Sequence, residues 1–149
     1  MKYLLIFKGE DNMSFVQWED KYSVHIKSID EQHKKLISLA NDLYYACTQD
    51  KDTANEEFKK VIKEAVDYVK VHFVFEEELL KKYDYPEFKQ HKMEHEEFIK
   101  KILEDVKNYE TGKNFIPNKF ARFLREWTLE HIAITDKKYE KFLKSKGIN

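Results

Sequence analysis

The sequence predicts an all-α protein, an antiparallel up-down-up-down four-helix bundle with an irregular N-terminal arm. Only 3 Gly and 2 Pro occur in 149 residues, and both residue types are unfavourable inside helices. Apolar residues recur at helical spacing in four segments joined by short connections, which favours antiparallel neighbours. We therefore expect one domain over residues 1–149, with an arm at 1–27 and the bundle at 28–146. Trp18 and Tyr22 are expected to anchor the arm.

The first two expected helices begin at sequences typical of capping boxes. In Ser28–Glu31 and in Thr53–Glu56, a hydroxyl residue is followed three residues later by glutamate. In such a pair each side chain caps the other's backbone N–H, so Ser28 and Thr53 are the predicted caps. The apolar stripe of the first helix consists of Ile29, Leu36, Leu39, Ala40, Leu43 and Cys47.

Proline and glycine mark the limits of the other two helices. Pro86 predicts the end of the second helix and the first turn of the third, because proline suits a first turn and disfavours helix before it. The third helix should end near Gly112, and the fourth should run from Pro117 to just before Gly147. The apolar stripe of the third helix consists of Phe88, Met93, Phe98, Ile102 and Val106.

Composition and charge exclude several classes of function. The 27 basic and 28 acidic side chains are mixed along the chain and give a net charge of -1. This balance argues against nucleic acid or an anionic membrane as a partner. Cys47 is the only cysteine, so no intrachain disulfide can form and nothing points to secretion. The apolar run Tyr3–Phe7 is too short for a signal peptide or a membrane span, and we expect a cytoplasmic protein.

The histidines are spread over all four expected helices. Five of the 6 His fall on them, and each helix carries at least one. His72 lies four residues before Glu76, and His91 lies four residues before His95, so the members of each pair share a helix face. A single such residue or pair is more often a surface or core feature than a ligand. Their conjunction is more informative, because five imidazoles buried together without a metal would leave polar nitrogens without partners.

His33 on the first helix, together with His131 and Asp136 on the fourth, completes a set of five imidazoles and two carboxylates. This donor set suits iron, and also zinc or manganese. Seven ligands are too many for one ion, so the set favours a dinuclear site. Over the five residues from His131 to Asp136, an ideal helix turns about 140° beyond one revolution. Both side chains can reach one site only through a local distortion or an off-axis approach.

Other motifs that carry chemistry are missing from the sequence. No His has Glu three residues before it, as the ferritin-like di-iron pattern requires. His91–His95 lacks the Glu placement of a zincin helix, and no Gly-rich phosphate loop occurs. Cys47 has no His arrangement that would make it a nucleophile. We therefore predict no catalytic residues.

The sequence resembles the hemerythrin and bacteriohemerythrin family over roughly residues 14–143. Five segments carry the resemblance: Trp18–Tyr22, Ile29–Leu36, His72–Glu77, His91–His95 and Trp127–Asp136. Each segment alone is a weak signal. Together they are specific, because they place the histidines and carboxylates described above in the order that the family has.

The resemblance implies a di-iron centre as the cofactor, with two bridging carboxylates and an oxo or hydroxo group as the third bridge. The iron that is fully coordinated would be held by His91, His95 and His131. The iron that keeps one position open for dioxygen would be held by His33 and His72. The bridging carboxylates would be Glu76 and Asp136.

A ligand pocket is expected beside the open iron, with walls that exclude water and disfavour the escape of charged oxygen species. Its predicted lining consists of Leu36, Phe73, Trp127, Thr128 and Ile132. Thr128 departs from the family, which commonly has Leu after this tryptophan, and a hydroxyl there can admit water or bind to oxygen. His25 also departs from the family pattern, and we expect it to be a loop residue.

The resemblance implies a protein that binds dioxygen reversibly, for carriage, storage or delivery. Two alternatives stay open. The same site in an enzyme would act on peroxide, nitric oxide or ferrous iron, and in a sensor it would pass the state of its ligand to a partner. The sequence leaves open whether the chain forms a homo-oligomer or meets a redox partner.

Overall fold

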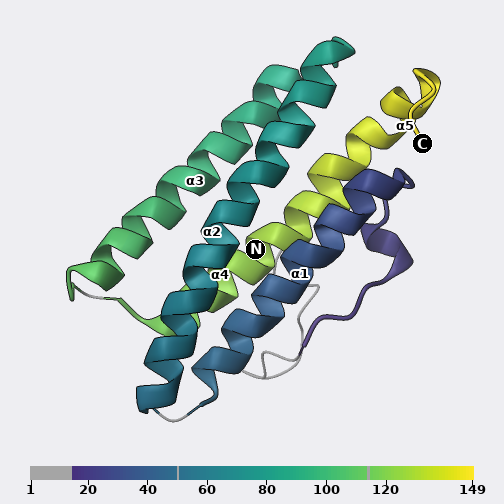
Figure 1. The fold of residues 1–149 in the computed structure, drawn as a ribbon. Coiled ribbons are helices and arrows are strands. Elements are labelled where there is room, and N and C mark those ends of the chain that lie inside the picture. The colour runs from purple at the N-terminus through teal and green to yellow at the C-terminus, as the bar shows by residue number, and fades with distance from the viewer. Residues whose placement is uncertain (1–14, 50, 114) are drawn as a thin grey trace.

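A computed structural model describes residues 15–49, 51–113 and 115–149, and in this part of the chain it contains helices and no strand. Four long helices run up-down-up-down, as predicted (Figure 1). They are α1 (Lys27–Cys47), α2 (Lys51–Lys82), α3 (Phe88–Glu110) and α4 (Pro117–Glu130). The fourth helix continues without a break through η3 (His131–Asp136), a π-helical turn, into α5 (Lys137–Ser145). α1 packs against α2 and α4, and α2 packs against α3.

Two apolar clusters fill the bundle, and a polar layer lies between them. One cluster includes Leu36, Phe73, Phe98 and Leu124, and the other includes Ile29, Leu80, Tyr85 and Tyr139. On each helix, the predicted metal-binding residues fall in the sequence between a member of one cluster and a member of the other. Burial of apolar surface on both sides therefore holds the polar layer at a fixed height in the bundle.

The predicted cap at Ser28 is wrong. The cap position is two residues earlier, at Ile26, so that α1 begins at Lys27, and no side chain caps it. In the first turn, Asp30 contacts the arm. It accepts a hydrogen bond from Ser23 Oγ at 2.6 Å and another from the backbone N–H of Val24 at 2.8 Å. A carboxylate is also favoured at this end by the helix dipole. The start of α1 thus fastens the arm to the bundle.

Other boundaries differ from the prediction by a few residues. Thr53 lies inside α2 and does not precede it, and its side chain is outside the described residues. Pro86 lies in the connection before α3, two residues short of the first helical turn. The predicted ends near Gly112 and Gly147 are confirmed, and both glycines have positive φ, which a residue without Cβ adopts readily. Met93 is 45% exposed and does not belong to the core, contrary to the predicted stripe.

The described part of the arm is held by polar and aromatic contacts; residues 1–14 of the predicted arm are outside the described residues. Val16 exchanges two hydrogen bonds with the side chain of Asn41, at 2.8 and 2.9 Å. The predicted anchors are confirmed: Tyr22, in the short 3-10 helix η2 (Asp20–Tyr22), is buried, and Trp18 packs beside it. Their apolar neighbours are Ile37, Leu129 and Ile132.

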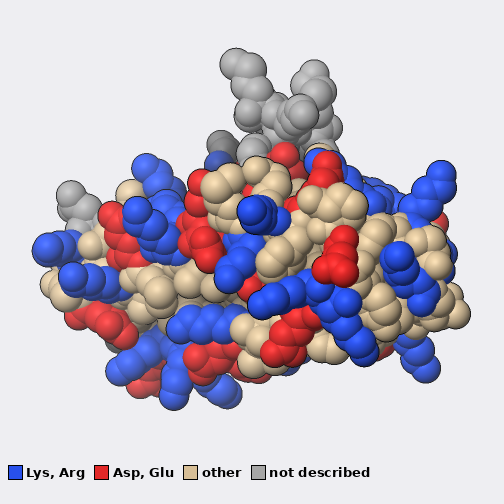
Figure 2. Space-filling model, turned by 90° about the horizontal axis from the view of Figure 1, so that it is seen from above, with Lys and Arg blue, Asp and Glu red and all other residues tan. Residues whose placement is uncertain are grey.

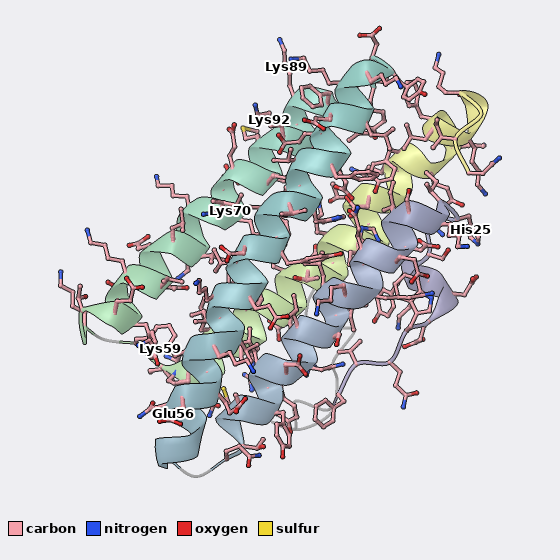
Figure 3. The ribbon with its side chains drawn as sticks, viewed as in Figure 1. His25, Glu56, Lys59, Lys70, Lys89 and Lys92 are labelled. Atoms are coloured by element: carbon pink, nitrogen blue, oxygen red, sulfur yellow. The ribbon has the colours of Figure 1, made fainter. Side chains whose placement is uncertain are left out.

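The outer surface carries charges of both signs. Basic and acidic side chains alternate over the face shown in Figure 2, without a broad area of one sign. Lys70, Lys89 and Lys92 point away from the bundle on α2 and α3 (Figure 3). Within the described residues, no helix is long and apolar enough to cross a membrane.

Candidate metal centre

The π-helical turn η3 places two predicted ligands on the same face. In a π-helix the hydrogen bonds join residues five apart, so side chains at this spacing come close to alignment. His131 and Asp136 are the first and last residues of the turn, and His131 Nε2 lies 3.0 Å from Asp136 Oδ1. The local distortion that their spacing predicted is therefore confirmed.

The structure brings all seven predicted ligand residues into one buried cluster, and none of them is more than 4% exposed. Their potential ligand atoms form two groups, and within each group all atoms lie within 4.8 Å of one another. The first group consists of Glu76, His91, His95, His131 and Asp136, and the second of His33, His72, Glu76 and Asp136. The two carboxylates belong to both groups, as bridging residues must. Their role as ligands stays a prediction.

The contacts inside the cluster suit a metal ion better than hydrogen bonds. His95 Nε2 and His131 Nε2 face each other at 3.0 Å, and both Nδ1 atoms lie close to carboxylates. Two neutral rings with their protons on Nδ1 would therefore set two lone pairs against each other. Among the described residues, neither oxygen of Asp136 accepts a hydrogen bond, yet the two lie 3.0 Å from the Nε2 atoms of His33 and His131. Buried polar atoms without partners are costly, and a cation between them would remove this cost. The donor set therefore fits metal ions.

The outer nitrogens of several rings have their own partners on neighbouring helices. His72 Nδ1 lies 2.7 Å from the amide oxygen of Gln32, and His95 Nδ1 lies 2.9 Å from Glu77 Oε1. Because these oxygens accept, the ring proton sits on Nδ1 and the lone pair of Nε2 points into the cluster. These contacts thus orient the two rings so that their Nε2 atoms can bind a metal ion.

Glu94 plays the same part for His131. Its Oε2 lies 3.2 Å from His131 Nδ1 and accepts a hydrogen bond from Thr135 Oγ1 at 3.0 Å. The hydrogen bond from His131 lowers the pKa of Glu94 to about 2, and Thr135 adds to this effect against a smaller opposing effect of burial. Glu94 is therefore a carboxylate at neutral pH.

Tyr139 is a site residue that the sequence did not reveal, because it lies at helical spacing among apolar residues such as Phe142 and Leu143. It is fully buried and donates a hydrogen bond from its hydroxyl to Glu76 Oε1 at 2.7 Å. Burial, together with the nearby charges of Asp136 and Glu76, raises the pKa of Tyr139 well above its usual value. The phenol thus stays protonated and holds one oxygen of Glu76 in place.

Gln32, Glu77 and Glu94 were missed as well. Each is the sequence neighbour of a predicted ligand, but each contacts a different ligand on another helix. Spacing along one helix cannot reveal such contacts, since adjacent residues on a helix do not face each other.

The carboxylates of the cluster attract positive charge strongly. Burial would lower the pKa of His33, but Asp136 and Glu76 outweigh burial and raise it to about 9. Burial also opposes protonation of His131, whose pKa Asp136 and Glu94 nevertheless raise to about 10. The imidazoles in turn hold the pKa of Glu76 well below its usual value, against the effect of burial. Without metal the cluster binds protons, and a metal ion would replace them.

A small cavity lies against the cluster at the predicted ligand pocket. Its volume is about 10 Å³, roughly what a single water molecule needs. All five predicted pocket residues line it, namely Leu36, Phe73, Trp127, Thr128 and Ile132. Phe73 stacks on His95 with ring centroids 3.6 Å apart, and Trp127 stacks on His131 at 4.4 Å. Aromatic faces thus shield the rings of both histidines.

His25 does not join the cluster. It lies before α1, has a φ of 55° and is partly exposed, as the loop prediction required (Figure 3). Its ring contacts the carboxylates of Glu140 and Asp20 at the outer end of the bundle.

Comparison with known proteins identifies the family. The model of the hemerythrin HHE cation binding domain matches residues 24–143. Bacteriohemerythrin of Stenotrophomonas maltophilia is 36% identical over 127 residues, which are 85% of this chain and 80% of that protein. A hemerythrin-like protein of Naegleria gruberi is 29% identical over 123 residues, which are 83% of this chain and 89% of that protein. The chain belongs to the hemerythrin family.

Solved structures agree with this assignment. A crystal structure of wild-type hemerythrin superimposes with a TM-score of 0.79 at 26% sequence identity. The match covers 86% of this chain and 97% of that one. The resemblance inferred from the sequence segments, and the four-helix fold predicted from the spacing of apolar residues, are both confirmed.

Proposed function

We propose that this chain holds two iron ions in the buried cluster and binds dioxygen reversibly there, for carriage, storage or delivery. The observation that carries the proposal is the sharing of Glu76 and Asp136 between two groups of ligand atoms. A carboxylate has two oxygens, so each of these residues can bind both ions. The donor atoms and the family both support iron.

The difference in size between the two groups supports an open position on one ion. One group offers residues for five ligands and the other for four, with both carboxylates counted in each. The small cavity touches His72 of the smaller group and His131 of the larger group. An ion held by His33 and His72 would have the fewer protein ligands, so we place the open position for dioxygen on that ion.

The surrounding residues would keep this site dry and ordered. Iron would supply the electrons that dioxygen takes up on binding. The side chains of Leu36, Phe73 and Ile132 limit the access of water to the cavity, and the hydroxyl of Tyr139 holds one oxygen of Glu76. Exclusion of water favours reversible binding, because it slows proton delivery and the loss of charged oxygen species.

Thr128 favours a second candidate function, an enzyme that reduces peroxide or nitric oxide at the same ions. Its hydroxyl is the one side-chain alcohol among the described residues that line the cavity. A hydroxyl there can hold water or pass a proton, which promotes turnover at the expense of a stable oxygen complex.

Anaerobic reduction followed by exposure to air distinguishes the two functions. For an oxygen carrier, we expect a new visible absorption band that disappears when oxygen is removed and returns over repeated cycles. Oxidation of the iron at the first exposure, with rapid consumption of added peroxide, would contradict reversible binding and support the enzyme.

Glu76→Ala and Glu78→Ala form a matched pair for the bridging role. Glu76 is fully buried among the imidazoles, whereas Glu78 is exposed and about 200° further around α2. We expect Glu76→Ala to lose most of its iron and Glu78→Ala to keep the wild-type content, measured by elemental analysis with circular dichroism as a check on folding. Equal iron in both variants would contradict the bridging role.

Thr128→Leu should slow the oxidative decay of the oxygenated protein without changing its iron content. The added volume can cost about 1–3 kcal/mol of stability in a tightly packed spot, so Thr128→Val serves as a second variant that removes the hydroxyl without enlarging the side chain. The measurement is the decay of the visible band in air at equal iron loading. Unchanged or faster decay in both variants would show that Thr128 does not control access to the site.

A further inference from the structure

Glu94 connects the candidate metal centre to solvent through His131. It lines an open pocket of about 240 Å³ between α3 and the end of the fourth helix, together with Glu97, Glu130 and Thr135. The side chain of Glu94 is 31% exposed, whereas that of His131 is 4% exposed. One carboxylate therefore contacts water on one side and a buried predicted ligand on the other.

The π-helical turn also fixes the position of Glu94. Thr135 is part of η3 and donates its hydroxyl to Glu94 Oε2, the same oxygen that lies 3.2 Å from His131 Nδ1. The turn that brings His131 and Asp136 together thus supplies the group that orients Glu94. The contact between Glu94 and His131 is held from both α3 and η3.

The two groups of ligand atoms differ in the charge of the residues that face the Nδ1 atoms of their histidines. In the larger group, the carboxylate of Glu77 faces His95 Nδ1 and that of Glu94 faces His131 Nδ1, so two rings have an anionic acceptor. In the smaller group, the acceptor behind His72 is the neutral amide of Gln32. An anionic acceptor makes an imidazole a more basic ligand and stabilises the higher charge on a metal ion.

We propose that Glu94 is a positioning residue that acts through His131 to favour the oxidised state of the ion in the larger group. The inference rests on the proposed iron pair and concerns how readily that pair is oxidised. Glu94 would act through its fixed negative charge and its contact with His131 Nδ1, and it would not bind the ion itself.

The test compares Glu94→Gln with Glu97→Gln. Glutamine keeps the shape and an acceptor oxygen but removes the charge. Glu97 lines the same pocket and is exposed, so its variant removes an equal charge from a residue that is not placed against His131. Thr135→Val is the third variant, since it removes only the hydroxyl that orients Glu94.

The first readout is the midpoint potential of the iron-loaded proteins, measured by optical titration with redox mediators. We expect Glu94→Gln to favour the reduced form about tenfold more than wild type, a positive shift of about 59 mV for a one-electron couple. Thr135→Val should shift in the same direction by less, and Glu97→Gln should match wild type. Equal potentials in Glu94→Gln and Glu97→Gln, at normal iron content, would overturn the inference and leave the proposed function intact.

The second readout does not depend on iron. Zinc suits the same donors and is diamagnetic, so ¹⁵N-edited NMR of zinc-loaded protein can observe the Nδ1–H of His131 directly. We expect this proton resonance to move upfield in Glu94→Gln and to stay in place in Glu97→Gln. An unmoved resonance in Glu94→Gln would overturn the role of Glu94. Failure of wild type to hold an iron pair would count against the proposed function alone.

Discussion

The burial of two carboxylates at one point of the bundle is the constraint on which the rest of the structure depends. Glu76 and Asp136 are both fully buried, and buried carboxylates are costly unless positive charge or hydrogen-bond donors surround them. Five imidazoles, drawn from α1, α2, α3 and the π-helical turn η3, meet this need in part. In the metal-free chain His33 and His131 do so by binding protons, and two cations would do so more completely.

Two features of the fold stabilise the buried carboxylates: apolar packing around the polar layer, and hydrogen bonds that orient its side chains. Apolar clusters on either side of the polar layer keep water out and fix the helices relative to one another. Acceptors outside the cluster then orient the rings, and Tyr139 orients Glu76. The π-helical turn contributes to this order twice, because it aligns His131 with Asp136 and also places Thr135 in hydrogen-bond contact with Glu94.

Much of this arrangement could be predicted from the sequence, because it follows from spacing along single helices. The pairs His72–Glu76 and His91–His95 share a face by helix geometry, and the five-residue interval after His131 predicted a distortion. The cap at Ser28 was mispredicted because α1 begins before it, at Lys27, where Asp30 joins the helix to the arm through tertiary contacts. Gln32, Glu77 and Glu94 were missed for the same reason, since their partners lie on other helices.

The central claim is that the cluster holds two ions bridged by the same two carboxylates. Anomalous diffraction at the iron absorption edge, from crystals of the iron-loaded protein, tests it most directly. The account predicts two iron peaks, one beside His91, His95 and His131 and the other beside His33 and His72, with Glu76 and Asp136 contacting both. A single peak, or two peaks without a shared carboxylate, would contradict it.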